Sequence, residues 1–287
     1  MTAAKAFGDN HRVKMTAGTA LVNGTKLYYE VSGQGTAVVL VHGLGLDRRM
    51  WDDQFAILAE RYRAIRYDLR GFGRSALPGS DAFRHGDDLR ALLDHLQAPT
   101  AHVVGLSMGG GVALHHGLLY PEATLSLVLV DSALDGHPWS AAWDESLDAI
   151  SDQALTAGAA AGNERWLAHD LFAPARERAA VQAKLAQIVR DSSGQHWIQN
   201  SPSRGIKPRA SARLAQISAP TLVVVGERDL PDFQTIAETL AQGIPGARKV
   251  VIAGAGHMSN MESSPEFNRT ILAFLADVDA QLISATT

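Results

Sequence analysis

A serine flanked by glycines is the feature of the sequence that most directly indicates chemistry. Gly105-Leu106-Ser107-Met108-Gly109 follows a run of strand-forming residues and precedes a segment of helical period. A serine at the tip of so tight a strand-to-helix turn projects its hydroxyl away from the sheet, and its strained backbone excludes bulky neighbours. The free N–H groups at the helix start favour developing negative charge there. We therefore expect Ser107 to be a nucleophile and not only a helix-capping residue.

A serine hydroxyl is a weak nucleophile at neutral pH, so Ser107 requires a base. Of the eleven histidines, His257 lies in a glycine-rich loop after the last predicted strand, from which its side chain can reach the sheet edge. Most others lie in predicted helices or open a strand, where packing or surface roles are expected: His85, His95, His102, His115, His116, His169 and His196. The sequence therefore predicts that His257 is the base.

A carboxylate is needed to hold the imidazole in its productive tautomer. Asp131 and Asp229 each follow a predicted strand, and both belong at the carboxyl edge of a parallel sheet, where such folds place their sites. Asp229 gives the order Ser, Asp, His and leaves room for one helix and one strand before His257. We expect Asp229 to be this acid, with Asp131 as the alternative.

Acyl transfer also needs two donors for the oxyanion that develops on the substrate. The backbone N–H of Met108, directly after Ser107, is the natural first donor. The second is expected from Leu44, because Gly43 and Gly45 let the loop after residues 37–41 present that N–H group. His42 is then an organiser of this loop, hydrogen-bonded to backbone, and not a second base.

Short β-branched runs alternate with longer segments of helical period, which is typical of an α/β fold whose mostly parallel sheet is covered by helices. The sheet is expected to open with an antiparallel pair joined at Asn23-Gly24. The predicted strands are 18–22, 26–32, 37–41, 62–67, 102–105, 125–130, 221–225 and 249–252, and the main helices 51–60, 82–96, 108–120 and 265–278. Together these elements predict an eight-stranded sheet.

The alternation breaks between residues 133 and 211, where helical segments dominate. One α/β body formed by residues 17–132 and 212–287 explains this better than two tandem domains. The segment 133–211 is then a helical cap inserted between strands six and seven, and residues 1–16 are expected to be a flexible N-terminus.

Composition excludes several classes of protein. The 287 residues are 46% hydrophobic and include 26 Lys and Arg against 30 Asp and Glu, so a nucleic-acid partner is not expected. The absence of cysteine excludes disulfides, thiolate metal sites and cysteine nucleophiles. No apolar run approaches the roughly 20 residues of a membrane helix. We expect a soluble, cytoplasmic protein without membrane partners, metal or organic cofactor, and either a monomer or a homo-oligomer.

The chain resembles the α/β-hydrolase superfamily, in particular its small bacterial carboxylesterases, enol-lactonases, cofactor-free haloperoxidase-type esterases and meta-cleavage-product hydrolases. The matching residues span about 18–278: His42-Gly43 with Trp51, the stretch 68–75, the Ser107 turn, Gly226 with Asp229, and Gly256-His257 with Glu262 and Phe267. The resemblance implies the α/β-hydrolase fold and a Ser-His-Asp triad. Ser107 argues against the aspartate nucleophile of dehalogenases and epoxide hydrolases of this fold.

Four of the five tryptophans lie in the predicted cap, and Trp139 and Trp143 share a helical face. We expect Trp139, Trp143 and Trp197 to contact an apolar or aromatic substrate, although they could instead fasten the cap to the body. Arg190 could serve as a carboxylate clamp, but a solvated helix arginine is the simpler interpretation.

The predicted reaction is hydrolysis of a carboxylic ester or lactone through an acyl-enzyme. Two alternatives stay open. One is C–C bond hydrolysis of meta-cleavage products by the same triad, which Met258 disfavours because such enzymes commonly carry tryptophan directly after the catalytic histidine. The other is a catalytically slow ligand-binding or receptor protein that has kept the fold.

Overall fold

A single eight-stranded sheet forms the centre of the computed structural model, which describes residues 15–199 and 201–286. The strand order is β1-β2-β4-β3-β5-β6-β7-β8, in which β2 pairs antiparallel with β1 and β4 and every other neighbouring pair is parallel. The strands are β1 Thr16–Val22, β2 Thr25–Ser32, β3 Ala37–Val41, β4 Arg63–Tyr67, β5 Ala101–Leu106, β6 Thr124–Val130, β7 Thr221–Gly226 and β8 Arg248–Ile252. This confirms the predicted α/β fold with a mostly parallel sheet.

Helices cover both faces of the sheet, as the alternation of side chains along β6 demonstrates. Ser126 accepts or donates a 2.8 Å hydrogen bond with His102, whose other ring nitrogen lies 3.1 Å from Asp279 of α11. Leu127, the next residue, points to the opposite face and meets Gly117 of α3. The helices outside 133–211 are α1 Asp52–Leu58, α2 His85–His95, α3 Met108–Leu119, α9 Pro231–Gly243, α10 Ser259–Glu262 and α11 Ser264–Thr286. Strands β3, β5 and β7 are consequently buried along their whole length.

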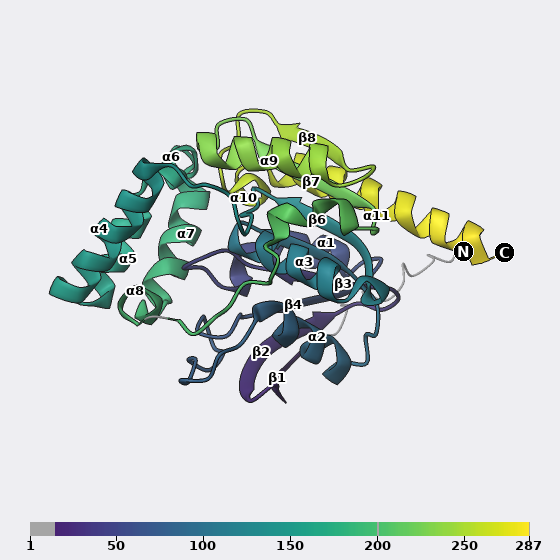
Figure 1. Cartoon of the computed structure of the whole chain (residues 1–287), viewed down its shortest axis with the longest axis horizontal. Coiled ribbons are helices and arrows are strands. Elements are labelled where there is room, and N and C mark those ends of the chain that lie inside the picture. The colour runs from purple at the N-terminus through teal and green to yellow at the C-terminus, as the bar shows by residue number, and fades with distance from the viewer. Residues whose placement is uncertain (1–14, 200, 287) are drawn as a thin grey trace, which may run out of the picture.

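Residues 133–211 separate β6 from β7 and hold five helices. These are α4 Ala141–Ala157, α5 Ala159–Leu167, α6 Ala173–Arg176, α7 Ala179–Asp191 and α8 Gln195–Ile198. Figure 1 shows them gathered at one end of the molecule, beside the sheet. Between 133 and 211, apart from residue 200, the described chain contains one isolated bridge, from Ser203 to Phe83, and no strand. The division into cap and body at these residue numbers stays our interpretation.

Several element boundaries differ from the sequence-based expectation. The helix predicted for 82–96 is α2 His85–His95, because Phe83 is extended and bridges to Ser203. The helix expected from 51 begins as a 3₁₀ turn, η1 Arg48–Trp51, and the last helix extends to Thr286. Further 3₁₀ turns are η2 Pro121–Ala123, η3 Asp170–Phe172, η4 Ala210–Ala212 and η5 Leu214–Gln216. Of the predicted flexible N-terminus, residues 1–14 lie outside the described residues and Thr16 begins β1.

Candidate active site

Ser107 occupies a strained turn between β5 and α3. Its φ of 55° and ψ of −119° lie in a backbone region that residues other than glycine rarely adopt. The surrounding backbone holds this conformation: Ser107 N donates to Val130 O at 2.9 Å, and Ser107 O accepts from the N–H groups of Gly110 and Ala133, each at 2.9 Å. The strain is therefore balanced by bonds to the neighbouring strand and to the following helix.

The two glycines of the motif are required by close backbone contacts. A Cβ atom at Gly105 would lie 2.1 Å from Gly109 O, and one at Gly109 would lie 2.2 Å from Val41 O. Neither carbonyl can withdraw, because both belong to the backbone next to Ser107. By contrast, a Cβ atom at Gly111 would meet only Ala133 O, at 3.6 Å.

The loop after β3 lies directly beside Ser107. A Cβ atom at Gly43 would approach Ser107 Cβ to 3.4 Å, so this backbone passes as close to the serine as packing permits. His42 fixes the loop as predicted: its Nδ1 donates to Gly43 O at 2.8 Å, and its Nε2 accepts from Leu69 N at 2.9 Å. Leu44, the expected oxyanion donor, follows this anchored segment.

His257 and Asp229 come together at the carboxyl edge of β7 and β8. The His257 Nδ1 lies 2.9 Å from Asp229 Oδ2, and the other carboxylate oxygen accepts from Leu230 N at 2.7 Å. Both side chains are buried, and the Phe233 ring packs on the imidazole at a centroid distance of 4.3 Å. Burial lowers the pKa of His257 to about 4, so the imidazole is neutral at neutral pH. With the Nδ1 proton directed at Asp229, Nε2 is the atom free to accept a proton.

Asp131, the alternative acid, lies behind Asp229 and does not contact the imidazole through a hydrogen bond. It accepts from Gly226 N at 2.7 Å and from Ser259 Oγ at 2.5 Å. Burial raises the pKa of both carboxyls well above their usual range. The charge on Asp229 raises the pKa of Asp131 further.

Glu262 fixes the backbone on both sides of His257. Its two oxygens accept from Gly256 N at 2.7 Å and from Met258 N at 3.1 Å. Arg178, between α6 and α7, donates to Glu262 at 3.3 Å and to Gly254 O at 2.8 Å. Glu262 is among the residues that carry the family resemblance, but the sequence alone predicted no role for it. The signal was its position five residues after His257, which places it at the end of the short helix α10.

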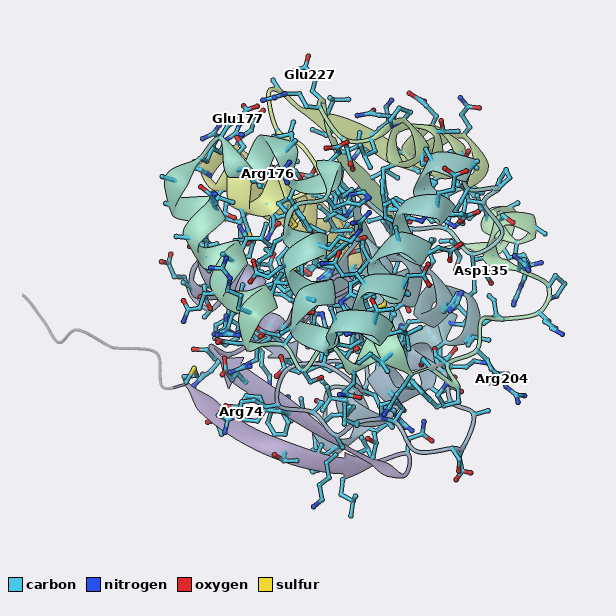
Figure 2. The ribbon with its side chains drawn as sticks, turned by 90° about the vertical axis from the view of Figure 1, so that its left-hand side faces the viewer. Arg74, Asp135, Arg176, Glu177, Arg204 and Glu227 are labelled. Atoms are coloured by element: carbon cyan, nitrogen blue, oxygen red, sulfur yellow. The ribbon has the colours of Figure 1, made fainter. Side chains whose placement is uncertain are left out.

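Pro174 of α6 fills the space beside Gly256, since a Cβ atom at that glycine would lie 2.5 Å from the proline ring. The inserted segment therefore touches the histidine loop directly, through both Pro174 and Arg178. Figure 2 looks onto this end of the molecule, with α4–α8 in front of the sheet.

Ser107 and His257 line the same small cavity, which has a volume of about 10 Å³, or room for roughly one water molecule. Leu44 is a further wall, together with Trp166 and Phe172 of the inserted segment. The sequence analysis did not single out Trp166. A second cavity of about 370 Å³ adjoins Leu44 and Met108, the two expected oxyanion donors.

The tryptophans predicted to contact substrate line neither of these two cavities. Trp139 and Trp143 stack on each other at 5.0 Å, and both meet Phe233, the ring that packs on His257. Trp197 is buried and donates to Asn163 at 3.0 Å. Their contact with substrate stays a prediction. Arg190 is exposed and pairs with Glu164, in agreement with the simpler interpretation of that residue.

The arrangement is suited to proton transfer and nucleophilic attack, because a neutral imidazole backed by a carboxylate shares a cavity with a serine hydroxyl. The oxyanion role of the Leu44 and Met108 N–H groups stays a prediction. Within the described residues, no group of three or more His, Asp or Glu side chains is placed to hold a metal ion. The same residues include no helix long and apolar enough to cross a bilayer.

Comparison with known proteins gives consistent matches over nearly the whole chain. A family model described as "alpha/beta hydrolase fold" matches residues 36–264. The 3-oxoadipate enol-lactonase 1 of Acinetobacter baylyi is 29% identical over 259 residues, 89% of this chain and 95% of that protein.

Two solved structures agree with that match. The enol-lactonase of Burkholderia xenovorans superimposes with a TM-score of 0.75 at 27% identity, over 90% of this chain and 100% of the other. A thermophilic esterase of Thermogutta terrifontis gives a TM-score of 0.74 at 27% identity, over 92% and 99% of the two chains.

Proposed function

The chain belongs to the alpha/beta hydrolase fold family, and on that premise we propose that it hydrolyses a carboxylic ester or lactone through a Ser107–His257–Asp229 triad. Relatives named as an enol-lactonase and an esterase support this bond type. The observation that carries the proposal is the convergence of three distant residues. His257 bonds Asp229 at 2.9 Å and shares a cavity with Ser107.

In this mechanism Ser107 Oγ attacks the ester carbonyl while His257 Nε2 takes the hydroxyl proton. Asp229 stabilises the imidazolium that forms, and the N–H groups of Leu44 and Met108 hold the tetrahedral oxyanion. The imidazolium then protonates the leaving alcohol, and the acyl group remains on Ser107. Water activated by the same imidazole cleaves this acyl-enzyme and releases the acid.

A fluorophosphonate probe tests the nucleophile directly. Ser107 in the full-length protein is expected to be the labelled residue, and Ser107→Ala is expected to abolish both labelling and ester or lactone turnover. The variant Ser132→Ala provides a matched control. Ser132 is a buried serine close to the same turn, and its hydroxyl donates to Ala133 O. Labelling that survives in Ser107→Ala would overturn the proposed mechanism.

A substrate panel separates the proposed reaction from C–C bond hydrolysis. Aryl esters, alkyl esters and five-membered lactones are expected to be turned over, with ring-cleavage dienoates slower by orders of magnitude. Turnover of dienoates alone would replace the ester reaction by C–C cleavage at the same triad. Labelling of Ser107 without turnover of any of these compounds would favour a binding protein.

A further inference from the structure

The 370 Å³ cavity beside the oxyanion donors has mostly apolar walls but an unusual set of polar side chains. Leu44, Phe72 and Met108 are among the apolar residues. Three imidazoles from three different segments also line it: His85 opens α2, His115 belongs to α3, and His196 to α8. Asp135, in the segment after β6, completes this group.

These polar residues carry atoms that have no hydrogen-bond partner. The described residues include ten buried side-chain nitrogen or oxygen atoms of this kind, and five belong to the lining of this one cavity. They are His85 Nδ1, His115 Nε2, Asp135 Oδ2 and both ring nitrogens of His196. Since buried polar atoms in folded proteins are nearly always paired, these five atoms are available to hydrogen-bond water or a bound molecule in the cavity.

The charges around the cavity restrict what that molecule can be. Burial lowers the pKa of His85 to about 3 and that of His196 to about 4, and it also lowers the pKa of His115, so these imidazoles are neutral at neutral pH. Arg70 is neutralised by two hydrogen bonds to Asp88. Among the described lining residues, the cavity therefore offers an anion no unpaired buried positive charge, and the Asp135 carboxylate repels anions.

The spacing of His115 and Asp135 suits an inserted hydroxyl group. His115 Nε2 and Asp135 Oδ2 lie 3.6 Å apart, too far for a direct hydrogen bond. A ligand hydroxyl between them could donate to the carboxylate and accept from the imidazole, thereby satisfying both atoms. Arg204 is exposed, and Figure 2 labels it on the same side of the inserted helices as Asp135. It is therefore assigned to the rim and not to this half-buried pair.

We propose that this cavity binds an uncharged, largely apolar group that bears a hydroxyl, such as a hydroxyaryl moiety, as the part of the substrate next to the scissile bond. The identity of that bond rests on the proposed function above. The recognition of the hydroxyl rests on the cavity alone, so the two can be tested separately.

Binding of small probes to the wild-type protein tests the recognition without turnover. Phenol is expected to bind about fivefold to tenfold more tightly than toluene, because its hydroxyl can bond His115 Nε2 and Asp135 Oδ2, and benzoate is expected to bind more weakly than either. Calorimetric or NMR titrations measure these affinities. Equal affinities for phenol and toluene would overturn the proposal, as would tighter binding of benzoate or benzylamine than of phenol.

The variant His196→Phe sharpens this experiment. It keeps a ring of similar size between Phe72 and Trp197 and removes two nitrogens that make no hydrogen bond, so the protein is expected to unfold at the same or a higher temperature. Because the hydroxyl is placed between His115 and Asp135, phenol is expected to keep its advantage over toluene in His196→Phe and to lose most of it in Asp135→Ala. His95→Phe is the control, because that exposed histidine of α2 is not among the residues that line the cavity. Unchanged phenol selectivity in Asp135→Ala would contradict the proposal.

Two matched ester series extend the test to catalysis. Hydroxyphenyl and tolyl acetates vary the alcohol, and methyl hydroxybenzoates and methyl toluates vary the acid. In one of these series kcat/KM is expected to favour the hydroxyl compound about fivefold to tenfold. Cleavage by Ser107 with no preference in either series would overturn only this inference. Cleavage of no ester and no lactone would overturn the proposed function, while the phenol titration would still decide the inference.

Discussion

Two adjacent aspartates illustrate how much a residue's role depends on its immediate partners. Asp229 faces His257 Nδ1, whereas Asp131 faces Gly226 N and Ser259 Oγ. We expect Asp229→Asn to lower kcat by about 10³-fold to 10⁴-fold, because an amide favours the wrong imidazole tautomer.

Asp131→Asn provides the matched control and is expected to change kcat less than tenfold, since an amide can still accept from Gly226 N and donate to Ser259 Oγ. Steady-state kinetics on one aryl ester measure both effects. If Asp131→Asn were the more damaging variant, the two carboxyls would have to exchange roles.

In the proposed mechanism the proton affinity of His257 sets the pH profile of the reaction. The base must be neutral to act, and its pKa is lowered to about 4. We therefore expect kcat/KM to rise with pH through about 4 and to be level from pH 6 to 8. Initial rates with a substrate whose own ionisation lies outside this range measure the profile. An inflection near 6.5 would show that the imidazole is solvated in the free enzyme.

At the scale of elements, the turn between β5 and α3 depends on backbone contacts that two glycines permit. Gly105→Ala or Gly109→Ala would force a Cβ atom to within about 2.2 Å of a carbonyl oxygen, so either variant is expected to lose activity and several kcal/mol of stability.

In the same helix, the Cβ atom of Gly111→Ala would meet its nearest neighbour only at an ordinary contact distance, and alanine is a better helix former than glycine. The free energy of unfolding is therefore expected to rise by about 0.5–1 kcal/mol. Urea unfolding curves compare the three variants. Destabilisation by Gly111→Ala as large as by Gly109→Ala would contradict this account of the turn.

The elements of the sheet could be predicted from sequence because buried parallel strands are continuous apolar runs, as at β3, β5 and β7. The serine, histidine and Asp229 could be proposed because each follows a strand end, and parallel topology brings those ends together. The partners of the inserted segment could not. Phe83 leaves the predicted helix for a bridge to Ser203, and Trp166, not Trp197, reaches the small cavity; both depend on packing between distant segments.

At the scale of the whole molecule, buried histidines make folding stability depend on pH. The pKa values of His85, His116 and His196 are lowered to about 3, 4 and 4 by burial. The unfolded chain binds protons at these sites below about 6.5 and the folded chain does not, so stability is full above 6.5 and falls as pH decreases towards 4. Each histidine contributes on the order of 1 kcal/mol to this loss.

Urea unfolding at pH 7.5 and pH 5.0 measures the loss, and His196→Phe is expected to reduce it. Asp131 acts in the opposite direction, because its raised pKa favours the folded state in acid. Equal stability at the two pH values would contradict the prediction that the buried histidines outweigh Asp131.

The contacts of Pro174 and Arg178 with the histidine loop have a consequence for how substrate enters. Any outward swing of α6 and α7 withdraws the proline ring from Gly256 and breaks the bonds from Arg178 to Gly254 and Glu262. The peptide on either side of His257 then loses part of its support while α6 and α7 are displaced. If substrate enters by this movement, entry and catalysis are coupled. The imidazole regains its full restraint only after α6 and α7 have returned over the bound substrate.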